Sequence, residues 1–256
     1  MKINTVKEKL AAGQPAVGTW LGLASPIAAE HMAHLGWDWL VVDTEHSPVG
    51  FETTVQCFQV IATTDTIPMA RVAWNDPTLI KRLLDAGALG LVVPMVNTRE
   101  EAEKAVAAMK YPPDGFRSLG GGRCLFYGED YFSWANDQVA CIVQIEHIQA
   151  VRNAEEILSV KGVDACFIGP NDLAGSMGIK PDLGAGDPRH EEAIQEVLRA
   201  AKKVGTPAGI HVPSAEHVSK RIAQGFQFIA LTNDAGFMKA GAKQAQAAIK
   251  GWAPRA

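Results

Sequence analysis

The feature that most constrains the fold is an alternation of short apolar runs with helical stretches, repeated eight times along the chain. Each apolar run has the length and composition of a buried parallel strand. The predicted strands are about 17–22, 39–44, 68–72, 90–96, 141–146, 166–168, 207–212 and 226–231. The helices predicted between and after them are about 26–35, 51–63, 77–86, 99–109, 150–160, 190–204, 215–224 and 237–249. Eight such units close a (β/α)8 barrel, so we predict an α/β TIM barrel formed as one domain by residues 1–256.

Composition narrows the class of protein further. Hydrophobic residues make up 47% of the chain and charged residues 20%, which suits a globule with a large core. The net charge is -4 and no cluster of Lys and Arg stands out, so a nucleic-acid partner is not expected. No run has membrane-spanning length and no signal peptide is recognisable, so no membrane partner and a cytoplasmic location are expected. The four cysteines lack C-x-x-C spacing, which favours reduced thiols over disulfides or a zinc site.

Two carboxylates follow consecutive predicted strands. Glu146 ends the run that begins at Cys141, and Asp172 follows the run that begins at Cys166. A right-handed crossover places the two strands side by side, so both carboxylates emerge at the same end of the barrel. Hard divalent cations prefer oxygen ligands, and we therefore predict a metal site there. Taken singly, Glu146 also fits a helix first turn and Asp172 a helix N-cap, but their paired placement favours the metal site.

Further polar residues gather at the rim, by which we mean the carboxyl-terminal ends of the strands, where barrel enzymes place their chemistry. His46 lies three residues after Asp43. An imidazole that donates an N–H to a carboxylate is oriented and made more basic, so this pair predicts a general base. The alternative for His46 alone is an exposed loop histidine. Arg71 ends the third strand, where its guanidinium needs an anionic partner such as an enolate or a carboxylate.

Other rim residues are expected to bind substrate. Gln144 lies two residues before Glu146 and therefore faces the same way in a strand. Asn171 opens a helical turn whose free N–H groups suit a substrate carboxylate, with Asp172 beside it. Trp20 and His211 are expected to line the same pocket.

The stretch 111–136 is long for a connection inside a barrel and includes three consecutive glycines at 120–122. Its length predicts a lid or a loop that binds the acceptor substrate. No lysine lies at the end of a predicted strand, so a covalent imine is not expected, and the metal must withdraw electrons instead.

At these residues the chain resembles the HpcH/HpaI aldolase family, the class II pyruvate aldolases that include 4-hydroxy-2-oxo-heptane-1,7-dioate and 2-dehydro-3-deoxyglucarate aldolases. The resemblance covers nearly the whole chain. It rests on the segments 36–40, 43–48, 74–77, 91–96, 111–113, 144–146 and 167–173.

The resemblance implies a barrel of the phosphoenolpyruvate/pyruvate type with Mg2+, Mn2+ or Co2+ held by Glu146 and Asp172. It implies that His46 with Asp43 is the base and that Arg71 stabilises an enolate. It also implies a homo-oligomer, a hexamer built as a trimer of dimers, in which the C-terminal helix is exchanged between subunits. In that assembly Asp85 reaches the site of a neighbouring subunit.

The chain departs from the family pattern at three places. Ser118 follows Arg117 where the family has glycine, His211 stands where leucine is usual, and Asn171 replaces a small residue. These positions are expected near the substrate, so they bear on which substrate is used rather than on the type of reaction.

The resulting hypothesis is a reversible aldol reaction between a 2-oxo acid, such as pyruvate or hydroxypyruvate, and an aldehyde. Two alternatives remain open. One is a lyase acting on an acyl-CoA of the citramalyl or malyl type, which needs a CoA site that no basic cluster supplies. The other is a non-catalytic barrel that binds 2-oxo acids and keeps the metal site.

Overall fold

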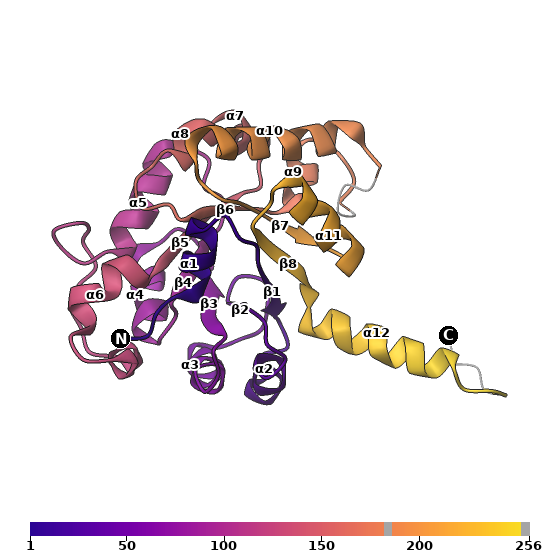
Figure 1. The fold of residues 1–256 in the computed structure, drawn as a ribbon, viewed down its shortest axis with the longest axis horizontal. Coiled ribbons are helices and arrows are strands. Elements are labelled where there is room, and N and C mark those ends of the chain that lie inside the picture. Colours follow the sequence, from indigo (N-terminus) through magenta and orange to yellow (C-terminus); the bar gives the residue numbers. More distant parts are fainter. Residues whose placement is uncertain (182–185, 252–256) are drawn as a thin grey trace.

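The computed structural model describes residues 1–181 and 186–251, and the strands in this part form a closed parallel barrel in chain order (Figure 1). The strands are β1 Ala16–Leu21, β2 Trp39–Asp43, β3 Ile67–Arg71, β4 Gly90–Val93, β5 Ala140–Ile145, β6 Ala165–Ile168, β7 Ala208–Val212 and β8 Phe228–Asn233. β1 pairs with both β2 and β8, which closes the ring. The predicted (β/α)8 fold is therefore confirmed.

Helices follow the strands and surround the barrel. They are α1 Thr5–Ala11, α2 Pro26–Ala33, α3 Phe51–Ile61, α4 Pro77–Asp85, α5 Arg99–Met109, η1 Arg123–Tyr127 (a 3-10 helix), α6 Tyr131–Gln138, α7 Ile148–Arg152, α8 Ala154–Leu158, α9 Pro170–Ser176, α10 Pro188–Val204, α11 Ala215–Gln224 and α12 Asp234–Ala247. The helix predicted over 150–160 is two short helices, divided at Asn153, whose side chain donates to the carbonyl oxygen of Asn97 at 2.8 Å. α1, η1 and α6 were not predicted.

Side-chain caps explain where several helices begin. The carboxylate of Asp76 accepts hydrogen bonds from the backbone N–H groups of Thr78 and Leu79, and Pro77 occupies the first turn of α4. Thr98 and Glu101 form a reciprocal capping box at the start of α5. These caps place the helix starts immediately after the rim, so the loops that carry the site are short.

The buried side chains form two layers. Outward-facing strand residues such as Cys141, Val143 and Ile145 pack against the helices, as the alternation along the strand predicted. Inside the barrel, the ring of Trp39 stacks on that of Phe228 with 4.3 Å between centroids. Gly18 makes room for this pair, since a Cβ there would lie 2.2 Å from the Trp39 ring. The interior below the rim is therefore a packed core, and the chemistry is confined to the rim.

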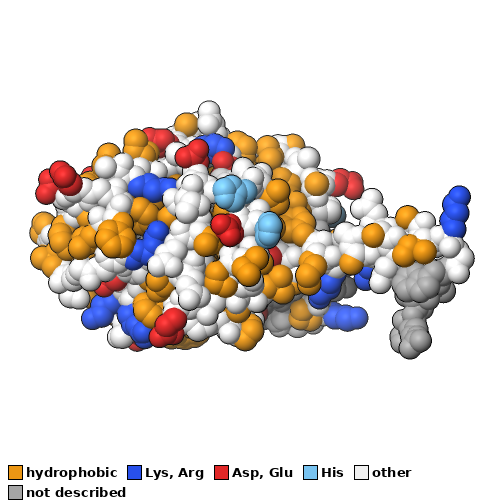
Figure 2. All heavy atoms as spheres, turned by 90° about the horizontal axis from the view of Figure 1, so that it is seen from below, with side chains coloured by type: hydrophobic (Ala, Val, Ile, Leu, Met, Phe, Trp, Pro, Cys, Tyr) orange, Lys and Arg blue, Asp and Glu red, His pale blue; other side chains and the backbone are white. Residues whose placement is uncertain are grey.

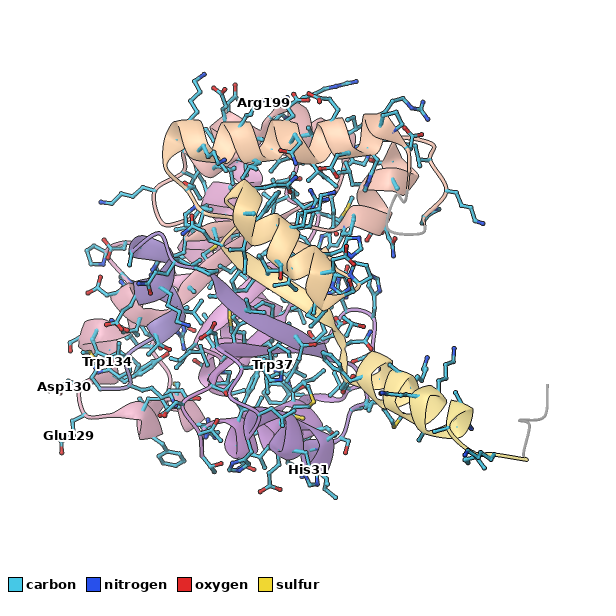
Figure 3. All side chains as sticks on the ribbon, turned by 45° about the vertical axis from the view of Figure 1, so that its right-hand side comes forward. His31, Trp37, Glu129, Asp130, Trp134 and Arg199 are labelled. Carbon is cyan, nitrogen blue, oxygen red and sulfur yellow. The ribbon has the colours of Figure 1, made fainter. Side chains whose placement is uncertain are left out.

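Residues 111–136 lie at the amino-terminal end of the barrel, opposite the rim. The hydroxyl of Tyr127 donates to the carbonyl oxygen of Gly87, which lies just before β4, at 2.6 Å. Figure 3 labels Trp134, whose indole donates to the carbonyl oxygen of Glu129 within the same stretch. No residue of 111–136 lines the pocket described below. The stretch is therefore not a lid over the pocket of its own chain.

α12 leaves the barrel and projects away from its rounded body (Figures 1 and 2). Near its start, the ring of Phe237 lies 5.8 Å from that of Trp37. The remaining turns are almost wholly exposed. In the described ranges, 1–181 and 186–251, no helix is long and apolar enough to cross a membrane.

Candidate active site

A cavity of about 420 Å³ opens at the rim. Its wall is formed by residues that follow most of the strands, which is where a barrel of this type collects functional groups. The residues that line it include Trp20, Asp43, His46, Arg71, Gln144, Asn171, Asp172, His211 and Asp234. The structure thus brings nearly all of the predicted site residues into one pocket.

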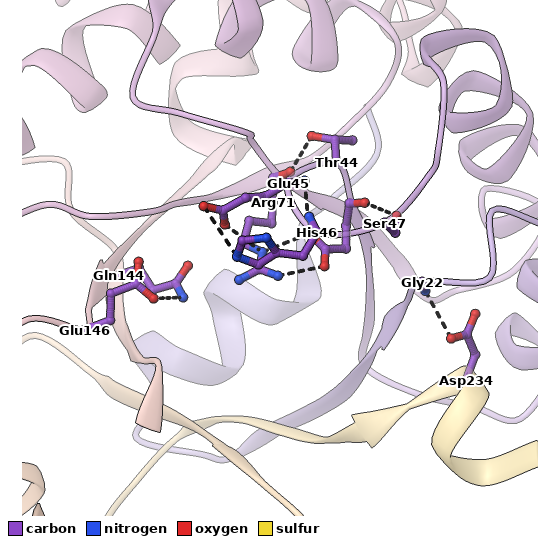
Figure 4. Close-up of polar contacts among 10 residues, drawn as sticks. Gly22, Thr44, Glu45, His46, Ser47, Arg71, Gln144, Glu146 and Asp234 are labelled. Atoms are coloured by element: carbon purple, nitrogen blue, oxygen red, sulfur yellow. Dashed lines mark hydrogen bonds and ion pairs between the residues drawn. The ribbon is translucent and has the colours of Figure 1, made fainter. Parts of the chain in front are cut away.

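Arg71 is the centre of the polar network in this pocket (Figure 4). Its Nε and Nη2 donate to the two oxygens of Asp43 at 2.9 and 2.7 Å, because β2 and β3 pair with these two residues in register. Its Cζ lies 4.7 Å from the centre of the Trp20 ring. A second carboxylate, Glu45, lies 3.2 Å from Nε. Nη1 makes no hydrogen bond within the described part of the chain, so it is available to an oxygen of a substrate.

Asp43 is committed to Arg71 and to the backbone. Burial acts to raise the pKa of Asp43, but the hydrogen bonds and charge of Arg71 outweigh burial and lower that pKa. Its Oδ1 also accepts from the backbone N–H of His46 at 3.3 Å. The pairing predicted between Asp43 and the imidazole is therefore made through the backbone in this structure.

The imidazole of His46 lies beside Glu45 instead. Its Nε2 is 3.8 Å from a Glu45 oxygen, and the His46 side chain is 63% exposed at the pocket mouth. Glu45 is far less exposed, at 16%. Its pKa is raised by burial and by the charges of Asp43 and Asp172, against the opposing charges of Arg71 and His46. Glu45 therefore stands between the imidazole and the guanidinium.

Glu146 is buried at the end of β5, next to the pocket wall. Its Oε1 accepts from the backbone N–H of Met95 at 2.9 Å, and its Oε2 accepts from the side chain of Gln144. Met95 has a φ of 53°, a left-handed conformation that is costly for a non-glycine residue. Gly169 is also required here, since a Cβ would lie 2.5 Å from Glu146 Oε2. The backbone is thus shaped around this carboxylate.

The charge around Glu146 suits a cation. Burial, together with the charges of Asp172 and Glu45, raises the pKa of Glu146 to about 7. Asp172 lines the pocket and is exposed. The carboxylates of Asp43, Glu45 and Glu146 therefore act on one guanidinium, that of Arg71, and Asp172 adds a further negative charge near Glu146. A divalent ion would offset this excess of negative charge.

The donor set suits an ion whose remaining coordination positions are filled by substrate and water. Within residues 1–181 and 186–251, no group of three or more His, Cys, Asp and Glu side chains is placed as a metal cluster. Glu146 and Asp172 would supply two oxygens, and Mg²⁺ commonly binds through one or two carboxylates, with the other positions filled by water and substrate. The donor set therefore fits such an ion.

Asp85 does not join this pocket. It ends α4 on the far side of the barrel, where its Oδ1 lies 2.7 Å from Nη2 of Arg117. The Asp85 side chain is 33% exposed there. Its predicted contact with another subunit stays a prediction.

Two residues of the site were expected at the rim from the sequence but were given no role there. Glu45 lies within the segment 43–48, and a carboxylate directly beside His46 was a usable signal for its role. Asp234 lines the pocket, and its carboxylate accepts from the backbone N–H groups of Gly22 and Leu23 at 3.0 and 3.1 Å. The signal for Asp234 was its position directly after the last strand.

Comparisons with known proteins identify the family of this chain. The family model of the HpcH/HpaI aldolase/citrate lyase family matches residues 16–240. A protein of Shigella flexneri named 4-hydroxy-2-oxo-heptane-1,7-dioate aldolase is 41% identical over 238 residues, which cover 90% of this chain and 87% of that protein.

Solved structures extend the likeness. A HpcH/HpaI aldolase/citrate lyase family protein from Burkholderia cenocepacia J2315 is 36% identical with a TM-score of 0.90, over 94% of this chain and 97% of that one. Citrate synthase SbnG is 29% identical with a TM-score of 0.85, over 94% of this chain and 95% of that one. The chain is therefore a carbon–carbon lyase that belongs to the HpcH/HpaI aldolase/citrate lyase family.

Proposed function

We propose that this lyase is a divalent-cation-dependent aldolase. It reversibly cleaves a 4-hydroxy-2-oxo acid into an aldehyde and pyruvate, or a related 2-oxo acid such as hydroxypyruvate. The observation that carries the proposal is the excess of carboxylates around Arg71 at a cavity of substrate size. The name of the Shigella flexneri relative supports the same reaction class.

The cation is the part of the site that the chain does not supply. Glu146 and Asp172 would hold it, and when bound it acts as a Lewis acid that polarises the ketone of the 2-oxo acid. The backbone N–H groups of Asn171 and Asp172, at the start of α9, bind the carboxylate of the same substrate. Gln144 lines the wall beside them and holds Glu146 in place.

His46 moves the proton. In the direction of bond formation, its imidazole accepts a proton from C3 of the 2-oxo acid, the enolate carbon bonds to the aldehyde carbon, and the new C4 alkoxide takes up a proton. In cleavage the C4 hydroxyl gives up its proton, the C3–C4 bond breaks, and the imidazole returns a proton to C3. A Glu45 oxygen lies 3.8 Å from Nε2 of the ring, and the side chain of His46 is open to solvent at the pocket mouth, so the proton can exchange with water. We therefore assign Glu45, and not the Asp43 side chain, as the carboxylate that orients the base.

Arg71 stabilises the charge that develops. Its bidentate pair with Asp43 and its contact with Trp20 hold it in one position, and Nη1 can donate to the enolate oxygen. A donor held in place before the reaction reorganises little as charge develops, and such a donor lowers the activation free energy by about 3–4 kcal/mol.

The aldehyde site and the assembly complete the proposal. We place the aldehyde at the open mouth near His46. The projecting, exposed α12 supports exchange of this helix between subunits of a homo-oligomer, the hexamer that the resemblance implied. Asp85 would then approach a neighbouring mouth.

Proton exchange tests the proposal directly. The protein is stripped with a chelator, resupplied with Mg2+, Mn2+ or Co2+, and incubated with pyruvate in heavy water while NMR follows loss of the C3 protons. Exchange that depends on the added ion, together with pyruvate release from 4-hydroxy-2-oxo acids, is expected. Binding of pyruvate without exchange under any ion would instead indicate a non-catalytic barrel.

The acyl-CoA alternative finds little support at the rim. Arg71 is the one Lys or Arg among the described residues that line the pocket, and Asp43 and Glu45 already pair with it. The phosphates of CoA would therefore meet an acidic mouth.

A further inference from the structure

His211 is a polar residue of the pocket that the proposed reaction does not use. It lies in β7, partly buried, and lines the cavity together with Trp20 and Arg71. Neither ring nitrogen makes a hydrogen bond within residues 1–181 and 186–251. His190 shows the contrast: its Nε2 lies 2.8 Å from the carbonyl oxygen of Pro170. A ring left without partners at the pocket wall indicates that a ligand group completes it.

The charge state of His211 limits what that group is. Burial, and next the charge of Arg71, lower the pKa of His211 to about 4, so the ring is neutral near pH 7. A neutral imidazole offers one donor and one acceptor. A carboxylate would gain no opposite charge from it, and an alkyl group would leave both nitrogens unsatisfied. A hydroxyl group, which both donates and accepts, matches it.

There is room for a substituted chain beside this ring. A second cavity of about 590 Å³ lies between α10 and α11, and His211 and Pro170 line both cavities. Its buried cation, Arg221, is already paired with Glu191 at 2.7 Å. His211 therefore borders open space on two sides, and Arg221 brings no unpaired charge to the second cavity.

We propose that His211 determines specificity by hydrogen bonding to a hydroxyl group of the substrate, so that a hydroxylated chain is preferred over an alkyl one. The inference rests on the proposed aldolase function and adds the chemical class of its substrate. The hydroxyl has two possible sources: C3 of the 2-oxo acid, or the carbon next to the aldehyde. The chemistry is the same in both, and the experiment separates them.

The experiment measures kcat/KM for four combinations of a 2-oxo acid with an aldehyde. Pyruvate or hydroxypyruvate is combined with acetaldehyde or glycolaldehyde, for the wild type and for His211→Leu. Two pairs are compared: pyruvate with hydroxypyruvate, and acetaldehyde with glycolaldehyde. In one of these pairs the wild type should prefer the hydroxylated member. His211→Leu should lose at least about tenfold of that preference, because a site built to hydrogen-bond a hydroxyl rejects the analogue that lacks it. The pair that changes identifies the source of the hydroxyl.

Two further variants make the result specific. His211→Asn keeps a donor and an acceptor and should recover part of the preference. His31→Leu is the matched control, since His31 is exposed on α2 away from the rim, and it should leave the preference unchanged (Figure 3). Each preference is a ratio measured in one preparation, so a variant that folds poorly still reports it.

The outcomes separate this inference from the proposed function. If the wild type is active and His211→Leu shows the same preferences in both pairs, His211 does not read a hydroxyl and the inference is overturned. If the wild type neither exchanges C3 protons nor forms a carbon–carbon bond with any pair, the aldolase proposal itself fails.

Discussion

Both ends of this barrel contain an arginine paired with an aspartate, and the two pairs differ in what surrounds them. Arg71 and Asp43 lie at the rim, and Arg117 and Asp85 lie at the opposite end, each with a shortest N···O distance of 2.7 Å. Arg117 has a fully buried side chain, whereas that of Arg71 is 11% exposed at the edge of a cavity.

The neighbours explain the difference. At the far end, Arg117 lies 4.4 Å from the ring centre of Tyr111 and 5.8 Å from that of Tyr131, and Asp85 is its one ion-pair partner in the described residues. At the rim, the carboxylates outnumber the arginine. Matched charge among aromatic rings holds the chain together, while surplus charge beside a cavity indicates a place where a ligand completes the structure.

The largest effect is expected at Glu146, one of the excess carboxylates at the rim. Glu146→Gln should lower ion-dependent C3 proton exchange by on the order of 10³-fold, because the ion loses a ligand and the substrate its Lewis acid. In the metal-free protein near pH 8, the same change should raise the free energy of unfolding. It removes a negative charge that burial and the neighbouring carboxylates destabilise. Exchange by NMR and denaturant unfolding measure the two effects.

The far end supplies the control for that variant. Asp85→Asn removes a carboxylate from a matched pair and should lower stability in chelator rather than raise it. If both variants shift stability in the same direction, the contrast between surplus and matched charge is not real.

His46→Ala should lower C3 proton exchange by on the order of 10²-fold or more, the usual contribution of a positioned base. The variant should still bind Mn²⁺, as measured by calorimetry, because the imidazole is not among the proposed ligands. The unfolding midpoint should also stay within error, since this side chain is mostly exposed. Undiminished exchange in this variant would remove His46 from the role of base.

At the far end the main effect expected within one chain is on stability. Arg117→Met should lower the free energy of unfolding by roughly 2–3 kcal/mol, because Asp85 loses its partner and the aromatic rings lose their contact. Arg99→Met is the matched control. Arg99 and Glu103 form a surface pair in which both side chains are about half exposed, so its loss should cost less than about 0.5 kcal/mol. Equal losses in both variants would argue against a structural role for Arg117.

The smallest effect concerns pH. The pKa of His211 is about 4 in the folded chain against 6.5 when unperturbed, so its contribution to stability is present above pH 6.5 and lost as pH falls toward 4. Relative to His211→Leu, the wild type should therefore lose about 1–2 kcal/mol over that interval, after allowance for partial exposure.

In the metal-free protein, Glu146 has the opposite effect on how stability changes with pH. Its pKa rises from 4.5 to about 7 on folding, so its contribution is present below pH 4.5 and lost as pH rises through 7. The two trends partly cancel in the wild type, which is why the difference between wild type and His211→Leu is the quantity to measure. Parallel unfolding curves from pH 4 to 7 would contradict the charge state inferred for His211.

Much of the fold was predictable, because the strand-and-helix alternation is local in the sequence. The same holds for Gln144 and Glu146, whose spacing of two in a strand places them on one face. The order of the elements also predicts where residues 111–136 lie, although the length of this stretch suggested a lid. A stretch that follows a helix and precedes a strand lies at the amino-terminal end of the barrel, as residues 111–136 do.

Partner choice was not predictable. Asp43 had three candidate partners: the His46 ring, nearby backbone N–H groups and Arg71, which is 28 residues away in the chain. The register between β2 and β3 decides among them by placing Asp43 opposite Arg71. Only the assembled barrel therefore shows that Glu45 is the carboxylate left for the imidazole.

The carboxylate of Asp234 links two parts of the molecule that would otherwise move separately. It is the first residue of the outward-projecting α12, and it also holds the loop that follows β1 at the pocket mouth. Any contact that tilts α12 must therefore shift or break these hydrogen bonds. The shape of the mouth is thus mechanically coupled, through this side chain, to whatever anchors the distant end of that helix.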